Sequence, residues 1–355
     1  MPKIAIIGTT IWGTTLGVVL AHKGLKVWLW ARTEEEATEL KNHGPNPALL
    51  PATSFPPQLF VTSSLSEALT RARAVILAVP SQTMRQNVKL VKDYLKPSML
   101  VVSAAKGLET SSSKRMSQVI TEEIDPSLWS NVCVLSGPNL SREIIRDLPA
   151  ATVVAAKDEI IANKAQKLLS APNFCIYTNT DVIGVELGGA LKNVIALGAG
   201  MVDGLGYGDN AKAALITRGL TEITALGVAL GANPLTFSGL AGLGDLITTC
   251  ASPLSRNHYV GTELAKGRSL QEITSSMTGV AEGINTTIGA WNLARQLELE
   301  MPITEKIYQV LFKGVDPHQV AAEVMVGQGK HELAGRRWEL FSFFKHRRRR
   351  RSKPV

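Results

Sequence analysis

The chain has 355 residues, 45% of them hydrophobic, and carries a formal net charge of +8 at pH 7. This length suits about two domains with well-filled cores, and so argues against a disordered chain. Its three cysteines are widely spaced and form no Cys-x-x-Cys pair, which argues against a disulfide framework and a cysteine-rich metal site.

The amino-terminal half alternates short apolar runs with polar stretches of helix length. Runs that are apolar on both faces are typical of parallel strands covered by helices on each side. This alternation predicts an α/β fold whose N-terminal domain, residues 1–180, is a Rossmann-type doubly wound sheet that binds a dinucleotide. The expected strands are residues 3–8, 26–31, 74–79, 99–104, 131–136 and 151–156.

The second half of the chain has mainly helical periodicity. Residues 181–205, 210–231 and 285–312 carry the clearest helical patterns. We therefore expect an all-helical, substrate-binding domain over residues 181–335. No charged leader precedes the first strand, and charge or glycine interrupts the apolar stretches before they reach the length of a membrane span. These features predict a soluble, cytoplasmic protein.

The last segment, residues 336–355, is an aromatic and basic tail. Seven of the basic residues lie within residues 345–353, so the rest of the chain is close to neutral, which argues against a nucleic-acid partner. Self-repulsion predicts disorder in this tail. A solvated tail, a nucleic-acid contact and a membrane contact are all open. Because aromatic residues precede the arginines, our hypothesis is weak peripheral contact with anionic membranes.

The stretch GTTIWG follows the first expected strand. Gly8 ends the strand and Gly13 opens a helix, so backbone N–H groups between them can hold a pyrophosphate. Thr10 stands where such a turn usually has its second glycine, so contact would come mainly from the backbone. Trp12 either packs against the sheet or lines the nicotinamide end of the site.

Arg32 follows the second strand, about 20 residues past the glycine turn, where an NAD-selective fold offers a carboxylate to the ribose. An arginine there suits the 2′-phosphate of NADP. Alternatively, Arg32 is solvated, and the acidic residues 34–36 just beyond it reach the ribose. The predicted cofactors are therefore NADP and NAD.

Two lysines are candidates for the reaction. Lys192 is the one charged residue in the otherwise apolar helical stretch 188–200. Burial lowers the pKa of a lysine, and a group that exchanges a proton with a carbonyl at neutral pH needs such a shift. Lys106 follows an expected strand, at the edge where open α/β sheets bind ligands. The alternative is that each lysine is solvated on the surface.

Two further stretches suggest a phosphorylated substrate. GLGDLITTC supplies Asp245 and Thr249, and SPLSRN supplies Ser255, Arg256 and Asn257. A guanidinium fork beside short polar donors is suited to holding a phosphate. The alternative for Asp245 is that it only caps a helix.

The stretches KGLE, GGALKNV, GDNAKAALITRGL, GLGDLITTC and PLSRN occur in this order, and with them the chain resembles bacterial NAD(P)-dependent glycerol-3-phosphate dehydrogenase. The resemblance covers roughly residues 3–335 and is most specific over 185–257. It implies reversible reduction of dihydroxyacetone phosphate to sn-glycerol 3-phosphate for glycerophospholipid synthesis, without a metal. A homodimer is a further expectation.

The resemblance also implies roles for individual residues. Lys192 matches the catalytic proton donor and acceptor. The implied substrate-binding residues are Lys106, Gly137, Asn139, Lys192, Asp245, Ser255, Arg256 and Asn257. The implied cofactor-binding residues are Gly8, Ile11, Trp12, Gly13, Arg32, Lys106, Ser141, Arg256, Val280 and Glu282. The sequence departs from the family pattern at Thr10, Ile11, Asn139 and Ser141.

Two other functions remain open. One is a non-catalytic phosphate-binding or membrane-tethered module, although a lysine and a carboxylate in the same site would serve no purpose there. The other is a related dehydrogenase acting on a β-hydroxyacid such as 6-phosphogluconate. The PLSRN stretch favours the smaller phosphate ester.

Overall fold

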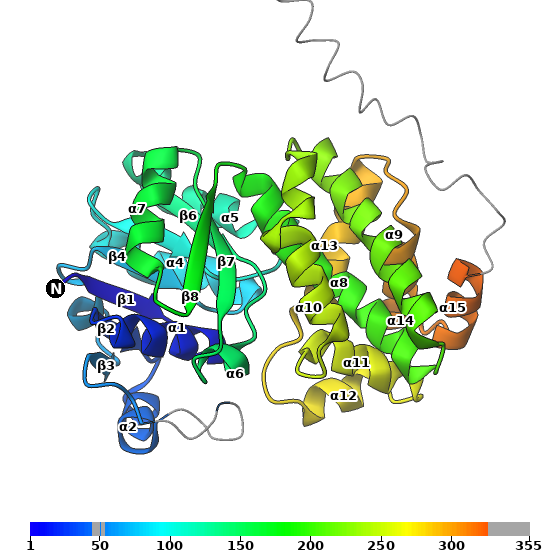
Figure 1. Cartoon of the computed structure of the whole chain (residues 1–355), viewed down its shortest axis with the longest axis horizontal. Helices are drawn as coiled ribbons and strands as arrows, with labels where there is room; N and C mark the ends of the chain where they lie inside the picture. The colour runs from blue at the N-terminus through cyan, green and yellow to red at the C-terminus, as the bar shows by residue number, and fades with distance from the viewer. Residues whose placement is uncertain (45–49, 51–53, 326–355) are drawn as a thin grey trace, which may run out of the picture.

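The computed structural model describes residues 1–44, 50 and 54–325. A sheet with flanking helices forms one part of the molecule, and a bundle of helices lies beside it (Figure 1). The strands are β1 (Lys3–Ile7), β2 (Lys26–Trp30), β3 (Leu59–Thr62), β4 (Ala74–Leu77), β5 (Leu100–Ser103), β6 (Val132–Ser136), β7 (Ala150–Ala155) and β8 (Phe174–Asn179).

The strands form one sheet in the order β3-β2-β1-β4-β5-β6-β7-β8. The chain moves outward from β1 to β3 and then crosses to β4 on the other side of β1, so the switch point of the sheet lies between β1 and β4. Open α/β sheets bind ligands at the carboxyl ends of the strands beside such a point. Gly8 follows β1 there, and Ala78 follows β4.

Two details differ from the sequence prediction. Residues 151–156 were expected to form a parallel strand, but β7 runs antiparallel to β6. A parallel crossover needs a long connection, usually with a helix, and this connection holds only the four-residue helix α6. The pattern also missed the edge strands β3 and β8, whose apolar runs, residues 59–61 and 174–177, are short.

Helices cover both faces of the sheet. Ile4 and Ile6 of β1 pack into the core under α1 and α7, while Ala5 and Ile7 pack into the core under α4 and α5. Both faces are therefore buried, as the apolar strands predict. These helices are α1 (Ile11–His22), α2 (Glu34–His43), α3 (Leu65–Leu69), α4 (Met84–Val91), α5 (Met116–Glu123), α6 (Ser141–Ile144) and α7 (Glu159–Leu169), with 3₁₀ turns η1 (Ser81–Thr83), η2 (Lys92–Tyr94) and η3 (Pro126–Asn131).

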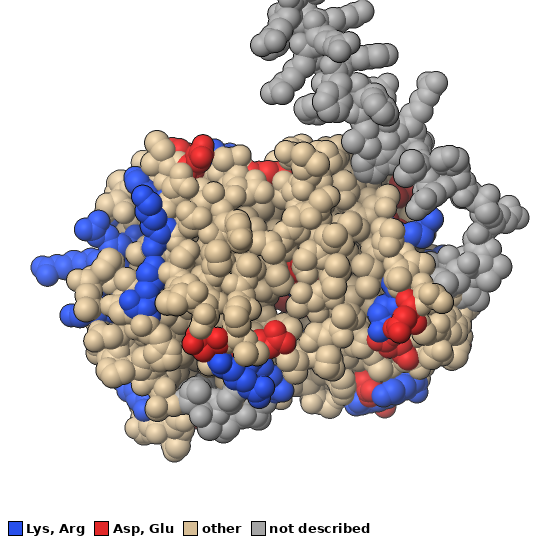
Figure 2. Space-filling view, viewed as in Figure 1, with Lys and Arg blue, Asp and Glu red and all other residues tan. Residues whose placement is uncertain are grey.

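Basic side chains gather at the end of the molecule where the N-terminus lies (Figure 2). Lys3, Lys26, Arg71 and Arg73 line a pocket there, at the amino ends of β1, β2 and β4. This basic edge is therefore opposite the carboxyl ends of the strands.

The helical part is built around α8 (Val182–Gly204), which is buried along nearly its whole length. Among the described residues, α8 is the one helix whose length and apolar composition would allow it to cross a membrane. However, 89% of its apolar 18-residue window is buried inside the molecule. Its neighbours are α9 (Gly208–Ala229), α10 (Asp245–Ala251), α11 (Arg256–Ala265), α12 (Leu270–Ser276), α13 (Glu282–Gln296), α14 (Pro302–Lys313) and α15 (Pro317–Met325), with the 3₁₀ turn η4 (Pro234–Ser238) and the π-helical turn η5 (Leu240–Gly244).

Small residues let α8 approach its neighbours closely. A Cβ atom added to Gly200 would lie 2.0 Å from the carbonyl oxygen of His258 in α11, and one added to Gly188 would lie 2.5 Å from that of Ala241 in η5. Both distances are far below a normal contact, so these positions require glycine. The close packing brings the start of α10 beside the middle of α8.

Candidate active site

Asp245 joins the two candidate lysines. Its Oδ1 forms an ion pair with Nζ of Lys192, and its Oδ2 lies 2.6 Å from Nζ of Lys106. The carboxylate is 1% exposed, so solvent screens these pairs little. A single buried carboxylate therefore holds two ammonium groups beside each other.

Each lysine reaches Asp245 from a different part of the fold. Lys192 comes from α8 and also donates to Oγ1 of Thr249 at 2.6 Å. Lys106 lies just beyond β5 and also donates to the carbonyl oxygen of Gly137, beyond β6, at 2.7 Å. The site thus lies where the carboxyl ends of β5 and β6 meet the helical part.

The environment changes the acidity of Lys106. Burial disfavours its charged form and lowers its pKa from 10.5 to about 8, while the negative charge of Asp245 opposes the shift and the positive charge of Lys192 adds to it. A lysine with such a pKa can hold or release a proton near neutral pH.

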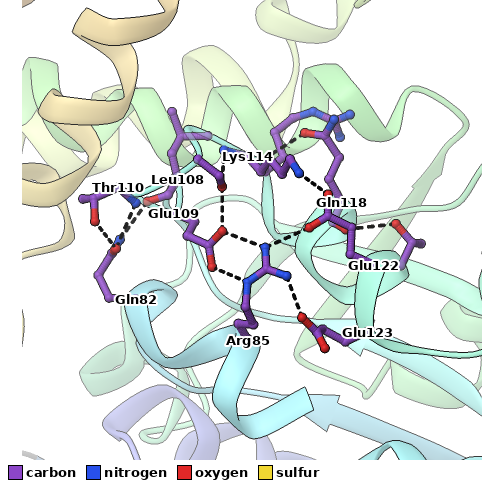
Figure 3. A network of polar contacts seen from close by, with 12 residues as sticks. Gln82, Arg85, Leu108, Glu109, Thr110, Lys114, Gln118, Glu122 and Glu123 are labelled. Carbon is purple, nitrogen blue, oxygen red and sulfur yellow. Dashed lines mark hydrogen bonds and ion pairs between the residues drawn. The ribbon is translucent and has the colours of Figure 1, made fainter. Parts of the chain in front are cut away.

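A polar network fixes the loop that carries Lys106 (Figure 3). Arg85 of α4 makes a two-pronged contact with Glu109, at 2.8 Å from both Nε and Nη2, and also pairs with Glu122 and Glu123 of α5. Gln82 binds the other side of the loop through the carbonyl oxygen of Leu108, at 2.7 Å. The loop is therefore tied to two helices on one face of the sheet.

Glu282 connects the two parts of the molecule. Oε1 accepts a hydrogen bond of 2.9 Å from the backbone N–H of Ser81, beyond β4, and Oε2 accepts one from the Ser81 hydroxyl. Burial raises the pKa of Glu282. Val280, on the same loop, is 42% exposed. Glu282 thus lies next to the switch point of the sheet, where a cofactor is expected.

Two residues of the PLSRN stretch make contacts within the helical part of the molecule. Ser255 is buried and accepts a hydrogen bond from the N–H of His258 at the start of α11. Asn257 is also buried: it donates to Oδ1 of Asn193 and accepts from the N–H of Gly283, both at 2.9 Å. These contacts join α8, α11 and α13. Substrate contact by either side chain stays a prediction.

Arg256 lies between these buried neighbours but has an exposed side chain. Its guanidinium lies over Gly279, where an added Cβ would be 2.5 Å from Nη1. Glu282 is close enough to interact with its charge. An exposed guanidinium at the start of α11 is suited to contact with a phosphate.

Asn139 and Ser141, where the sequence departs from the family pattern, lie beyond β6. Nδ2 of Asn139 donates to Oγ1 of Thr152 at 3.1 Å, whereas its buried Oδ1 has no partner among the described residues. Ser141 begins the short helix α6. Gly137 in the same loop has a φ of +149° and no room for a Cβ against Thr152, so glycine is required there.

The glycine turn after β1 packs closely against the loop after β4. Gly8 has a φ of +108°, and a Cβ there would lie 2.8 Å from the carbonyl oxygen of Ala78. Thr10 caps α1: its hydroxyl accepts from the N–H of Gly13 at 3.1 Å and donates to that same carbonyl of Ala78 at 2.7 Å. We therefore expect the N–H groups of Ile11 and Trp12, at the open end of α1, to contact a pyrophosphate.

Two cofactor candidates on this side have other contacts. The Trp12 ring packs edge-on against Phe174, with centroids 6.2 Å apart, so it contributes to the core. The Arg32 side chain is exposed and donates to Oδ1 of Asn87 at 3.2 Å. A cofactor role for both residues stays a prediction.

The structure thus brings Lys106, Gly137, Lys192 and Asp245 into direct contact, and places the glycine turn and Arg32 at separate points along the sheet edge. Sequence reasoning missed Ser81 and Asn193, which hold Glu282 and Asn257 in place. The signal for Asn193 was its position directly after Lys192. Ser81 had no comparable signal, because its partner is 201 residues away.

Comparison with known proteins shows the family of the chain. The model of the NAD-dependent glycerol-3-phosphate dehydrogenase N-terminus matches residues 3–162, and that of the C-terminus matches residues 181–322. A glycerol-3-phosphate dehydrogenase [NAD(P)+] of Dehalococcoides mccartyi (strain ATCC BAA-2266 / KCTC 15142 / 195) is 61% identical over 99% of this chain and 98% of its own. One from Moorella thermoacetica is 48% identical over 95% of this chain and 99% of its own.

A solved structure shows the same fold. The crystal structure of glycerol-3-phosphate dehydrogenase from Coxiella burnetii has a TM-score of 0.86 and 35% identity, and covers 91% of this chain and 98% of its own. Because the family models and the relatives extend over both parts of the molecule, the chain belongs to the NAD-dependent glycerol-3-phosphate dehydrogenase family.

Proposed function

We propose that this protein reduces dihydroxyacetone phosphate to sn-glycerol 3-phosphate, reversibly, with NADH or NADPH, and so provides the backbone for glycerophospholipids. The main support is the contact of one buried carboxylate, Asp245, with the ammonium groups of both Lys192 and Lys106. A binding module would have no use for two lysines held by one buried carboxylate.

In this proposal, Lys192 donates a proton to the carbonyl oxygen of the substrate. The nicotinamide cofactor, when bound, supplies the hydride to the carbonyl carbon. Asp245 keeps Lys192 oriented for the transfer, and Lys106 stabilises the negative charge that develops on the oxygen. Thr249 limits the directions in which the Lys192 ammonium can turn.

The substrate phosphate binds at the open side of the site. Arg256 contacts it through its exposed guanidinium, with Asn139 as a second ligand that donates from its Nδ2. Gly8, Gly13 and the start of α1 hold the pyrophosphate of the cofactor, while Glu282 and Ser141 lie nearer its nicotinamide end. Val280, which is 42% exposed, is the remaining proposed cofactor contact.

The direct test is oxidation of NADH and NADPH on addition of dihydroxyacetone phosphate, followed at 340 nm. The proposal expects turnover with this substrate and none with NADP plus 6-phosphogluconate. Turnover of 6-phosphogluconate alone would favour the β-hydroxyacid dehydrogenase alternative. No turnover of either compound, with nucleotide binding intact, would favour a binding module.

The expectations about cellular location, oligomeric state, domain bounds and the basic tail are also proposals. We infer a cytoplasmic enzyme that forms a homodimer, with residues 1–180 and 181–335 as its domains. The basic tail, residues 336–355, is proposed to contact anionic membranes weakly, but it lies outside the described residues. Light scattering tests the dimer. Sedimentation with anionic vesicles, comparing the full chain with one ending at Gly335, tests the tail.

A further inference from the structure

A carboxylate lies between the glycine turn and the end of β2. Oε1 of Glu36 accepts a hydrogen bond from the hydroxyl of Thr9, in the turn after β1, and Oε2 accepts one of 2.9 Å from the backbone N–H of Arg32. The side chain is half-buried. Glu36 thus bridges the two loops that border the adenosine end of a dinucleotide site in this fold.

Glu36 differs from its acidic neighbours in this contact. Glu34 binds the hydroxyl of Ser63 and lies 3.8 Å from Lys41. Glu35 is exposed on the first turn of α2. Glu36 lies in the first turn of α2, but its contact with Thr9 joins residues 27 positions apart in the sequence. A role at the start of that helix therefore does not explain this contact.

The Arg32 side chain has other contacts than this carboxylate. Its guanidinium carbon lies 5.9 Å from the ring centre of Trp30, and Nη2 contacts Asn87 of α4. The backbone of Arg32, and not its charge, is what Glu36 binds. The Glu36 carboxylate therefore contacts the glycine turn itself, through Thr9, whereas the described contacts of the Arg32 guanidinium are with Trp30 and Asn87.

These charges favour one cofactor over the other. A carboxylate accepts hydrogen bonds from the two hydroxyl groups of an unmodified ribose, and it repels a 2′-phosphate, which is dianionic near neutral pH. We propose that Glu36 is the residue that makes this enzyme prefer NADH to NADPH. The proposal rests on the proposed function only in taking the glycine turn as a nicotinamide dinucleotide site.

The first experiment needs no variant. Adenosine 2′,5′-bisphosphate and 5′-AMP differ only in the 2′-phosphate, and calorimetry measures the affinity of the full-length protein for each. The proposal expects tighter binding of 5′-AMP, and about tenfold tighter binding of NADH than of NADPH. Tighter binding of the 2′-phosphorylated compound of each pair would overturn it.

The second experiment compares Glu36→Gln with Glu39→Gln, which removes the same charge from an exposed position one turn further along α2. Glu36→Gln keeps the size and an oxygen acceptor but loses the repulsion. Its ratio of NADPH to NADH affinity should rise about tenfold, while that of the control stays within about twofold. A ratio for Glu36→Gln that stays within the range of the control would overturn the proposal.

The two proposals can fail separately. Nucleotide binding is measured without dihydroxyacetone phosphate, so a preference for NADH that depends on Glu36 would support this inference even if the substrate were not turned over. Conversely, turnover of dihydroxyacetone phosphate with equal kcat/KM for both cofactors in the wild type would leave the proposed function intact and contradict the role of Glu36.

Discussion

Asp245 and Lys106 are 139 positions apart in the sequence, yet Oδ2 of the Asp245 carboxylate lies 2.6 Å from Nζ of Lys106. The other oxygen of the same carboxylate pairs with Lys192. This shared carboxylate makes the two lysines interdependent, because the charge that stabilises one ammonium also compensates for its repulsion of the other.

Removing the shared charge should affect activity strongly. Asp245→Asn leaves two lysines close together without a counter-ion, so we expect kcat to fall by about 10²-fold or more, with little change in the Kd for NADH. Asp203→Asn is the control: it breaks ion pairs with Lys212 and His258 on the helical part and should leave kcat within about twofold. A similar kcat for both variants would refute the bridging role.

The pKa of Lys106 predicts the alkaline limb of the pH profile. Below its pKa of about 8 the side chain is charged and stabilises the developing oxyanion, and above it this charge is lost. We therefore expect kcat/KM for dihydroxyacetone phosphate to fall as the pH rises through about 8. Lys106→Arg keeps a charge at all these pH values, so any remaining activity should lack this limb. An unchanged limb in that variant would assign it to another group.

The network around Arg85 should stabilise both the fold and the Lys106 loop. Arg85→Ala leaves three carboxylates without their shared cation, so we expect a loss of about 1–3 kcal/mol in the free energy of unfolding and a raised KM for the substrate. Urea denaturation measures the first effect. Lys89→Ala is the control, because Lys89 is over half exposed and lies 4.0 Å from Glu123. Equal stability of the two variants would contradict this role.

Glu222 predicts a pH dependence of stability. This buried carboxylate of α9 accepts hydrogen bonds from the N–H groups of Ile303 and Thr304 at the start of α14. Burial raises its pKa to about 7, with these hydrogen bonds opposing the shift. As the pH rises, Glu222 therefore loses its proton in the unfolded chain at a lower pH than in the folded protein. The free energy of unfolding is thus highest below the ordinary pKa of a glutamate and falls until the pH has passed about 7.

The neutral variant Glu222→Gln tests that sign. Relative to the wild type it should gain at most about 3 kcal/mol of unfolding free energy between pH 5 and pH 8. Chemical denaturation at both pH values measures this change. A relative loss over the same interval would show that the two N–H donors outweigh the cost of burying the charge.

The sequence predicted those features that follow from local patterns. Continuous apolar runs located six strands, and glycine after the first of them located the turn at Gly8. The edge strands β3 and β8 were missed because their apolar runs, residues 59–61 and 174–177, are short and give a weak local signal. The reversed direction of β7 was also missed, because local apolar pattern is the same for parallel and antiparallel strands buried on both faces.

Only part of the candidate site could be predicted, because motifs are local patterns whereas the contacts between them are not. Motifs identified Lys106, Lys192 and Asp245, and the sequence analysis already placed Lys192 beside a carboxylate. That Asp245 also binds Lys106 depends on how α8, α10 and the loop after β5 pack together. Thr10 was read as a weakened glycine turn, whereas its hydroxyl caps α1. Long-range contacts of this kind leave no periodic signal in the sequence.

Lys192→Ala, measured for turnover and for cofactor binding in parallel, tests the central claim most directly. Because Lys192 acts on the reacting oxygen and not on the dinucleotide, kcat for reduction of dihydroxyacetone phosphate should fall by about 10²–10⁴-fold, with the Kd for NADH unchanged within about twofold. A kcat within about tenfold of the wild type, in a folded variant that binds NADH normally, would contradict the assignment of Lys192 as the proton donor.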